Sequence, residues 1–105
     1  MHDDLENLKA IINRLVESAT KERAAAYSAA REARDLADAV ATANWKNARA
    51  FARAKKANAK IFGDSLNAAD SHFIKMLGEA ARAVDPIVGL QRHASAVYSM
   101  ANQYR

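Results

Sequence analysis

Five cations between residues 46 and 60 are spaced so that together they could bind a large anion. They recur at alternating intervals of three and four residues, which places them on one face of a helix, and they are Lys46, Arg49, Arg53, Lys56 and Lys60. Residues 39–62 contain six basic side chains and no acid, so no neighbour in the sequence relieves their repulsion. A phosphate backbone, an acidic protein groove or an anionic membrane surface would favour such a stripe. We expect contacts to phosphates rather than to bases, because the chain has no recognition-helix, RNA-binding or zinc-spacing motif.

The same stripe has a simpler interpretation as a solvated helix face. Acids of a second copy would then neutralise it, and the candidates are Glu32, Asp35 and Asp38. Trp45 begins the stripe, and we include it in the binding site. The first role that we expect of its large apolar ring, however, is that of a packing anchor.

Trp45 also supports a family resemblance. A chain of this length with a central Trp between helices resembles the secreted WXG-type helical hairpins. Here the tripeptide is Trp45-Lys46-Asn47, which lacks the defining glycine, and Pro86 interrupts what would be the second long helix. No function is carried over from this resemblance.

Residues with catalytic or metal-binding potential are present, but their spacing suits neither task. His72 with Asp70 makes half a metal site, and no second His follows four residues later. His93 lies three residues from Leu90 and four from Val97, so it could face an interface whose assembly depends on protonation. The chain has no cysteine, no nucleophile elbow and no phosphate-binding loop. We therefore predict that the protein is not an enzyme and needs no cofactor or metal.

The elements that must position the cations are helices. The first 62 residues contain no glycine or proline, are rich in alanine, and repeat apolar residues in heptads from Leu5 onward. This pattern predicts one helix over about 4–62, which we favour over two helices that break near Asn44, where weaker helix formers occur. Gly63-Asp64 is a stop-and-start signal that predicts a helix over about 65–84. Asp85-Pro86 is a second start signal, for a helix over about 86–104.

These elements predict a single all-α domain over residues 1–105, a helical bundle of a long helix packed with two shorter ones. Much of the apolar content is alanine, which buries little surface, so a monomeric core would be thin. We therefore expect a homodimer or a higher oligomer to complete the bundle. The expected oligomer interface consists of large aliphatic residues at the apolar heptad positions, namely Leu5, Leu8, Ile12, Leu15, Leu36 and Val40.

The composition also narrows the function. The acidic N-terminus is not a signal peptide, and no apolar run approaches the roughly 20 residues of a membrane span, so we expect a cytoplasmic protein. We predict an oligomeric binding or regulatory protein whose 45–60 face docks an acidic partner, with nucleic acid as the leading candidate. One alternative is a small inhibitor or accessory protein, of a phage or mobile-element type, that binds a host or viral protein through apolar helix faces. Another is a purely structural, self-assembling helical bundle.

Overall fold

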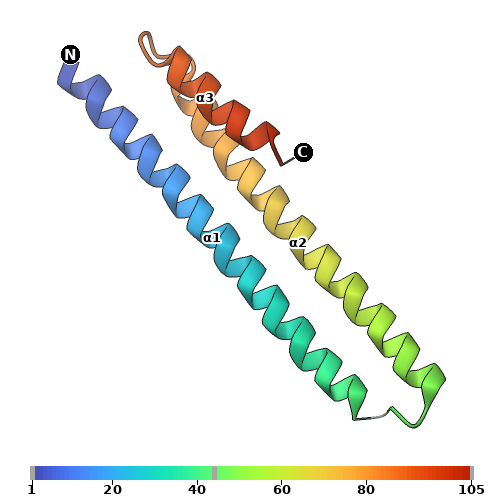
Figure 1. Cartoon of the computed structure of the whole chain (residues 1–105). Coiled ribbons are helices and arrows are strands. Elements are labelled where there is room, and N and C mark those ends of the chain that lie inside the picture. The colour runs from blue at the N-terminus through green and yellow to red at the C-terminus, as the bar shows by residue number, and fades with distance from the viewer. Residues whose placement is uncertain (1, 44, 105) are drawn as a thin grey trace. The chain divides into compact units, whose positions relative to one another are not determined.

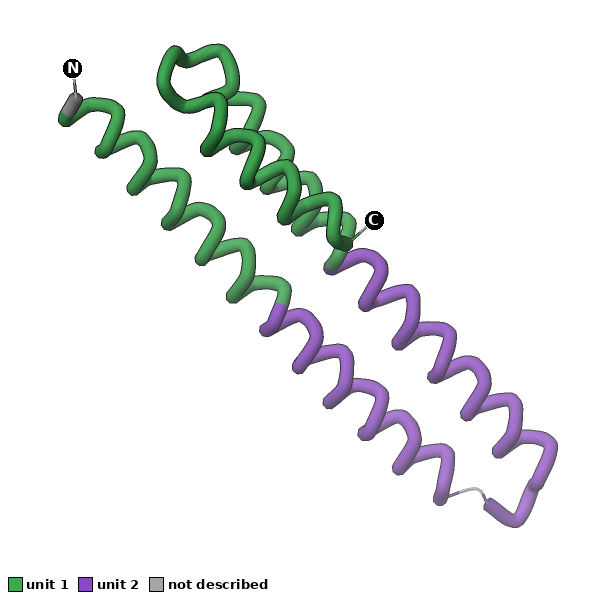
Figure 2. The backbone as a smooth tube through the Cα atoms, turned by 45° about the horizontal axis from the view of Figure 1, so that its top comes forward, with its two compact units in different colours: residues 1–23, 70–105 green, residues 24–69 purple. Residues whose placement is uncertain are grey.

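A computed structural model describes residues 2–43 and 45–104 and contains three helices. They are α1 (His2–Thr42), α2 (Ala48–Val84) and α3 (Gln91–Asn102), shown in chain order in Figure 1. No strand occurs in these two ranges, so the predicted all-α fold is confirmed. The chain divides into two compact units, unit 1 with residues 1–23 and 70–105, and unit 2 with residues 24–69 (Figure 2).

The long helix that we favoured over 4–62 is wrong, because the chain turns between Thr42 and Ala48. It follows the alternative with a break near Asn44, a residue that lies outside the described ranges. The hydroxyl of Thr42, the last residue of α1, donates a hydrogen bond to the carbonyl of Asp38 at 2.8 Å. Asn47 caps the next helix, since its Oδ1 accepts a 3.1 Å hydrogen bond from the N–H of Ala50.

Helix α2 continues through Gly63, so the predicted boundary at Gly63-Asp64 is also wrong. Asp64 does not cap a new helix. Its Oδ2 instead accepts a 2.9 Å hydrogen bond from Nζ of Lys60, one turn earlier. The apolar face keeps its helical phase across the glycine, with the inward-facing residues Phe62, Leu66, Ala69 and Phe73. Tertiary packing on both sides of Gly63 therefore outweighs the local stop signal.

We predicted that the third helix begins at Pro86. It begins at Gln91 instead and ends at Asn102. Pro86 lies in a turn, because the N–H of Ile87 bonds to the carbonyl of Val84 at 2.9 Å. Gly89 then has a φ of 95°, in the left-handed region that favours glycine. Asp85 and Pro86 thus begin the short turn that connects α2 to α3, and α3 starts only after this turn.

The core of the protein lies in unit 1, where parts of all three helices pack together. Its buried members are Ile12, Ala19, Phe73, Leu77, Ala80, Ala81, Val84, Leu90, Ala94, Val97 and Ala101. Leu5 and Leu8 are partly buried against this cluster. We predicted that Leu5, Leu8 and Ile12 form an oligomer interface. They instead pack in the core of the same chain with residues of α2 and α3.

A polar and aromatic contact joins the segments of unit 1. Nε of Arg23 donates a 2.7 Å hydrogen bond to Oδ1 of Asp70, and its guanidinium carbon lies 4.2 Å from the ring centroid of Tyr104. The ring of Tyr104 meets that of Phe73 edge to face, with centroids 5.0 Å apart. The residues that follow α3 are thereby tied to α1 and α2.

Unit 2 is a hairpin of the end of α1 and the start of α2 (Figure 2). Ala41 is its one fully buried apolar residue in the described part of the chain. Polar contacts join the two helices: Asp38 accepts a hydrogen bond from Asn58 at 3.1 Å and forms a 3.3 Å ion pair with Lys55. The guanidinium carbon of Arg34 lies 4.3 Å from the ring centroid of Phe62. Unit 2 is therefore held by few buried groups.

Candidate functional site

Four of the five predicted cations lie on α2, and one does not. Lys46 lies in the turn before the helix, because the capping residue Asn47 starts α2 after it. The prediction of a five-residue helical stripe is therefore wrong at Lys46. The exposed cations on the helix, which we call the basic face, are Arg49, Arg53, Lys56 and Lys60.

The basic face points away from α1 of unit 2. Asn58 marks the side of α2 that meets α1, since its amide donates to Asp38. Arg49 and Asn58 are nine residues apart, which at 3.6 residues per turn is two and a half turns, so they lie on opposite sides of the helix. The half-buried rings of Phe51 and Phe62 lie on the side of Asn58. The helix therefore presents its cations to solvent and its aromatic residues to α1.

The cations differ in what they contact. Nζ of Lys60 lies 2.9 Å from Oδ2 of Asp64, and this hydrogen bond and the carboxylate charge raise the pKa of Lys60. Arg49, Arg53 and Lys56 form no ion pair with any residue in 2–43 or 45–104. The basic face thus contains three cations free to meet a partner and a fourth that is locally neutralised.

The acids of α1 in unit 2 are partly engaged inside the chain. The hydrogen bond from the Asn58 amide, followed by the contact with Lys55, lowers the pKa of Asp38. Asp35 lies 3.3 Å from the guanidinium of Arg34, its neighbour in the sequence. Lys55 is therefore the cation that α1 neutralises, and it lies outside the basic face.

Net charge is divided unequally between the two units. Residues 24–69 contain eight basic and four acidic side chains, a net charge of +4. Residues 1–23 and 70–105 contain eight of each, a net charge of zero. The whole formal charge of the protein therefore belongs to the unit that carries the basic face.

Trp45 lies in the turn between α1 and α2, and 64% of its surface is exposed. The backbone N–H of Trp45 donates a 3.1 Å hydrogen bond to the carbonyl of Thr42, and Nζ of Lys46 lies 6.0 Å from the centroid of the Trp45 ring. The prediction that Trp45 anchors packing is wrong within the chain, because most of its surface is exposed. Trp45 and Lys46 instead form an exposed aromatic and cationic pair.

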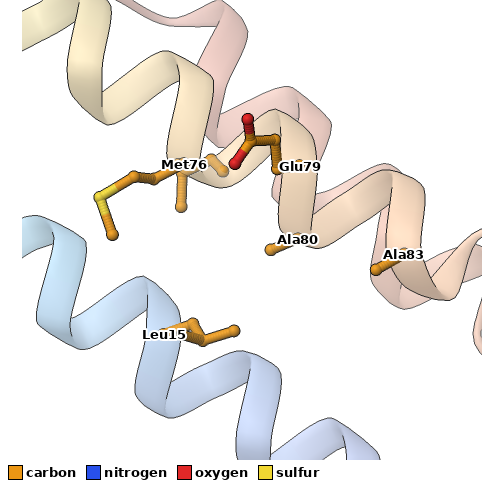
Figure 3. A pocket seen from close by; sticks show the side chains of 6 residues that line it. Leu15, Met76, Glu79, Ala80 and Ala83 are labelled. Carbon is orange, nitrogen blue, oxygen red and sulfur yellow. The ribbon is translucent and has the colours of Figure 1, made fainter.

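Two apolar grooves contain the predicted interface residues that remain exposed. Leu15 lines a groove of about 310 Å³ in unit 1, where it points toward α2 (Figure 3), together with Met76, Leu77, Glu79, Ala80 and Ala83. Leu36 and Val40 line a groove of about 520 Å³ in unit 2, together with Ala33, Ala37, Ala41, Ala54 and Asn58. Leu36 is 70% exposed and Val40 is 63% exposed. Ile61 of α2 is exposed as well, although its heptad position predicts a packed side chain.

His72 and His93 do not assemble a metal centre with the other described residues. Nε2 of His72 lies 3.4 Å from Oε2 of Glu22, whereas Asp70, its expected companion, binds Arg23. His93 is half-buried, and its Nε2 has no hydrogen-bond partner among the described residues. Within those residues, no three His, Asp or Glu side chains come close enough to hold an ion.

In the part of the chain that the structure describes, no helix combines the length and the apolar character that crossing a membrane requires. Comparison of the chain with protein-family models, with curated proteins and with solved structures found no match. The candidate site therefore consists of what this chain itself presents, which is the basic face, the Trp45-Lys46 turn and the groove of unit 2.

Proposed function

We propose that this protein binds an acidic macromolecule through its basic face, that nucleic acid is this partner, and that it does so in the cytoplasm. The observation that carries the proposal is the exposure of Arg49, Arg53 and Lys56 on one side of α2 without an ion pair in the described part of the chain. Like charges at such spacings repel one another by roughly 0.2–0.5 kcal/mol per pair, and a bound polyanion would relieve that repulsion.

The spacing of these cations suits a phosphate backbone. Arg49 and Lys56 are seven residues apart, which is about 10 Å along the helix axis at 1.5 Å per residue. Duplex DNA presents one negative charge for about every 1.7 Å of its axis, so several phosphates lie within that length. Contacts of this kind hold the backbone and do not read the base sequence.

The test is the binding of a labelled random-sequence DNA duplex, followed by fluorescence anisotropy at increasing salt. Three phosphate contacts predict that the logarithm of the binding constant falls with the logarithm of salt concentration with a slope of about −2.7. The triple variant Arg49→Glu, Arg53→Glu, Lys56→Glu should lose binding and keep its helical circular dichroism. Binding of this variant equal to that of the wild type would show that the basic face is only a solvated surface.

A matched control separates this local effect from net charge. Arg14, Lys75 and Arg92 are exposed cations of unit 1 that form no ion pair with a described residue. Their triple replacement by Glu changes the net charge by the same amount, and it should leave most of the binding intact. Equal losses in the two triple variants would contradict the proposal, because overall charge alone would then explain the affinity.

A second candidate function is self-association, and the groove of unit 2 favours it. Unit 2 exposes Leu36, Val40 and Ile61 while it buries only Ala41 among its described residues. Full burial of a large apolar side chain contributes about 1.5–3 kcal/mol, so covering these three would stabilise the hairpin substantially. A second copy offers the same apolar surface, as a two-fold interface requires.

Light scattering over a range of protein concentrations tests this second candidate. The wild type should have the mass of a dimer or a larger oligomer, and the double variant Leu36→Glu, Val40→Glu should have that of a monomer. Because both side chains are already exposed in the single chain, this variant should keep its helical content. A monomeric mass for the wild type at high concentration would overturn self-association.

A further inference from the structure

Trp45 combines three properties in one place. It is the single tryptophan of the chain, it lies in the turn before α2, and 64% of its surface is exposed. Nζ of Lys46 lies 6.0 Å from its ring centroid, so a cation already accompanies the aromatic surface. The basic face begins at Arg49, about one helical turn further along the chain. An aromatic ring therefore lies at the end of a row of cations.

We propose that Trp45 stacks on an unpaired base, and that single-stranded nucleic acid is the preferred ligand of this protein. The inference rests on the proposed function, because it assigns the phosphate backbone of that strand to the basic face. In a duplex the faces of the bases are stacked on one another and closed to a side chain. A single strand exposes them, and binding sites for single strands combine a positive surface with aromatic rings in this way.

The surroundings of Trp45 favour a base over a membrane or an apolar protein surface. From residue 41 to residue 50 the chain contains no other large apolar side chain, and the turn itself contains Lys46 and Asn47. Insertion into a membrane interface would bury only the ring of Trp45 and would bring the polar side chains of Lys46 and Asn47 with it. A base needs only one ring on which to stack, and Lys46 can meet the phosphate beside it.

Fluorescence of the single tryptophan reports stacking directly. The titrants are a single-stranded dT oligonucleotide, a duplex of the same length and inorganic polyphosphate, all at low salt. Single strands should quench Trp45 in a saturable manner. Polyphosphate, which has the charge and no bases, should bind without quenching, and its binding is followed by competition with a labelled oligonucleotide. The duplex should bind more weakly than the single strand.

The variant Trp45→Ala tests the energetic role of the ring. Its affinity for the labelled single strand should fall about 5- to 150-fold, which corresponds to the usual range for one stacked base. Its affinity for polyphosphate should stay unchanged. The conservative variant Trp45→Phe should restore part of the lost affinity. Because most of the surface of Trp45 is exposed, far-ultraviolet circular dichroism should be the same for all three proteins.

The outcomes separate this inference from the proposed function. Binding of both single strands and polyphosphate without quenching, or with no loss in Trp45→Ala, would overturn stacking and leave the basic face as a phosphate site. No binding of any polyanion would overturn the proposed function and the stacking with it. A blue shift with anionic lipid vesicles and no quenching by single strands would overturn the inference in favour of a membrane surface.

Discussion

Replacement of Gly63 by alanine should stabilise this protein. Gly63 lies inside α2, which runs without interruption from Ala48 to Val84. A Cβ added at Gly63 would meet no atom within 4 Å, and the residue does not have a positive φ. Alanine therefore fits without strain, and it also restricts the unfolded chain more than glycine does.

The expected gain is about 0.5–1 kcal/mol in the free energy of unfolding. This is the difference between glycine and alanine in the interior of a helix, and the open space around Gly63 adds neither a clash nor a new contact. For a protein of this size, 1 kcal/mol shifts the melting temperature by about 4–8 °C. Urea unfolding followed at 222 nm measures the change, and the slope with denaturant should stay the same.

The sign of the effect decides between two structures of this segment. If a helix ended at Gly63, as the sequence alone predicts, the glycine would adopt a left-handed conformation and alanine would destabilise it by about 1 kcal/mol or more. A loss of stability in Gly63→Ala would therefore refute the continuous α2. Gly89→Ala is the matched control, because Gly89 has a φ of 95° and an added Cβ would lie 3.2 Å from Cδ1 of Leu5. That variant should be destabilised.

The remaining predictions concern a histidine with a buried ring nitrogen, a helix cap and a carboxylate, and urea unfolding measures all three. His93→Leu should leave stability unchanged or raise it, because a buried polar atom without a partner costs about 1–3 kcal/mol; a clear loss would show that Nε2 has a partner in solution. Asn47→Ala should lower stability by about 1 kcal/mol and Asn47→Asp should preserve it, since Oδ1 caps α2, and equal losses would argue against the cap. The Asn58 amide and Lys55 lower the pKa of Asp38 below its usual 3.8, so its contribution is present above that pH and is lost as the pH falls through the folded pKa. Asp38→Asn should remove this acid-dependent part, whereas an unchanged pH profile below about pH 4 would contradict the interaction.

Periodicity alone is sufficient to predict which side of α3 is buried. In the sequence, Leu90, Ala94, Val97 and Ala101 follow one another at intervals of three or four residues, and all four side chains are buried. Apolar residues three and four apart form one stripe in any helix, so this prediction needs no knowledge of the other elements.

Where a local signal competes with packing, the sequence alone misleads. Gly63 and Asp64 have the residue types of a helix boundary, yet the apolar faces on both sides of them remain in phase and pack as one helix. Asp85 and Pro86 have the types of a helix start, yet the positive φ of Gly89 delays α3 to Gln91. Whether a helix start or stop signal takes effect depends on contacts with residues distant in the sequence, and helix propensity carries no information about those contacts.

The candidate site could be predicted in part for a similar reason. Spacing places Arg49, Arg53 and Lys56 on one side of a helix, and the structure agrees. Spacing does not show that Lys55 pairs with Asp38, because that contact depends on how α1 and α2 of unit 2 align across the turn. The same alignment of the two helices leaves Arg49, Arg53 and Lys56 without an acid from α1. The availability of these cations therefore depends on the hairpin as a whole.

Charge and core belong to different parts of this chain, and this separation makes the proposed site open to a direct test. Unit 1 contains eleven of the twelve buried apolar residues among the described residues, and its net charge is zero. Unit 2 contains the net charge of +4 and, among its described residues, a single buried apolar residue, Ala41. Substitutions on the basic face therefore remove cations from a surface that contributes little to the core. A loss of nucleic-acid binding in such variants, with unfolding of unit 1 unchanged, would have to come from the loss of the contacts themselves.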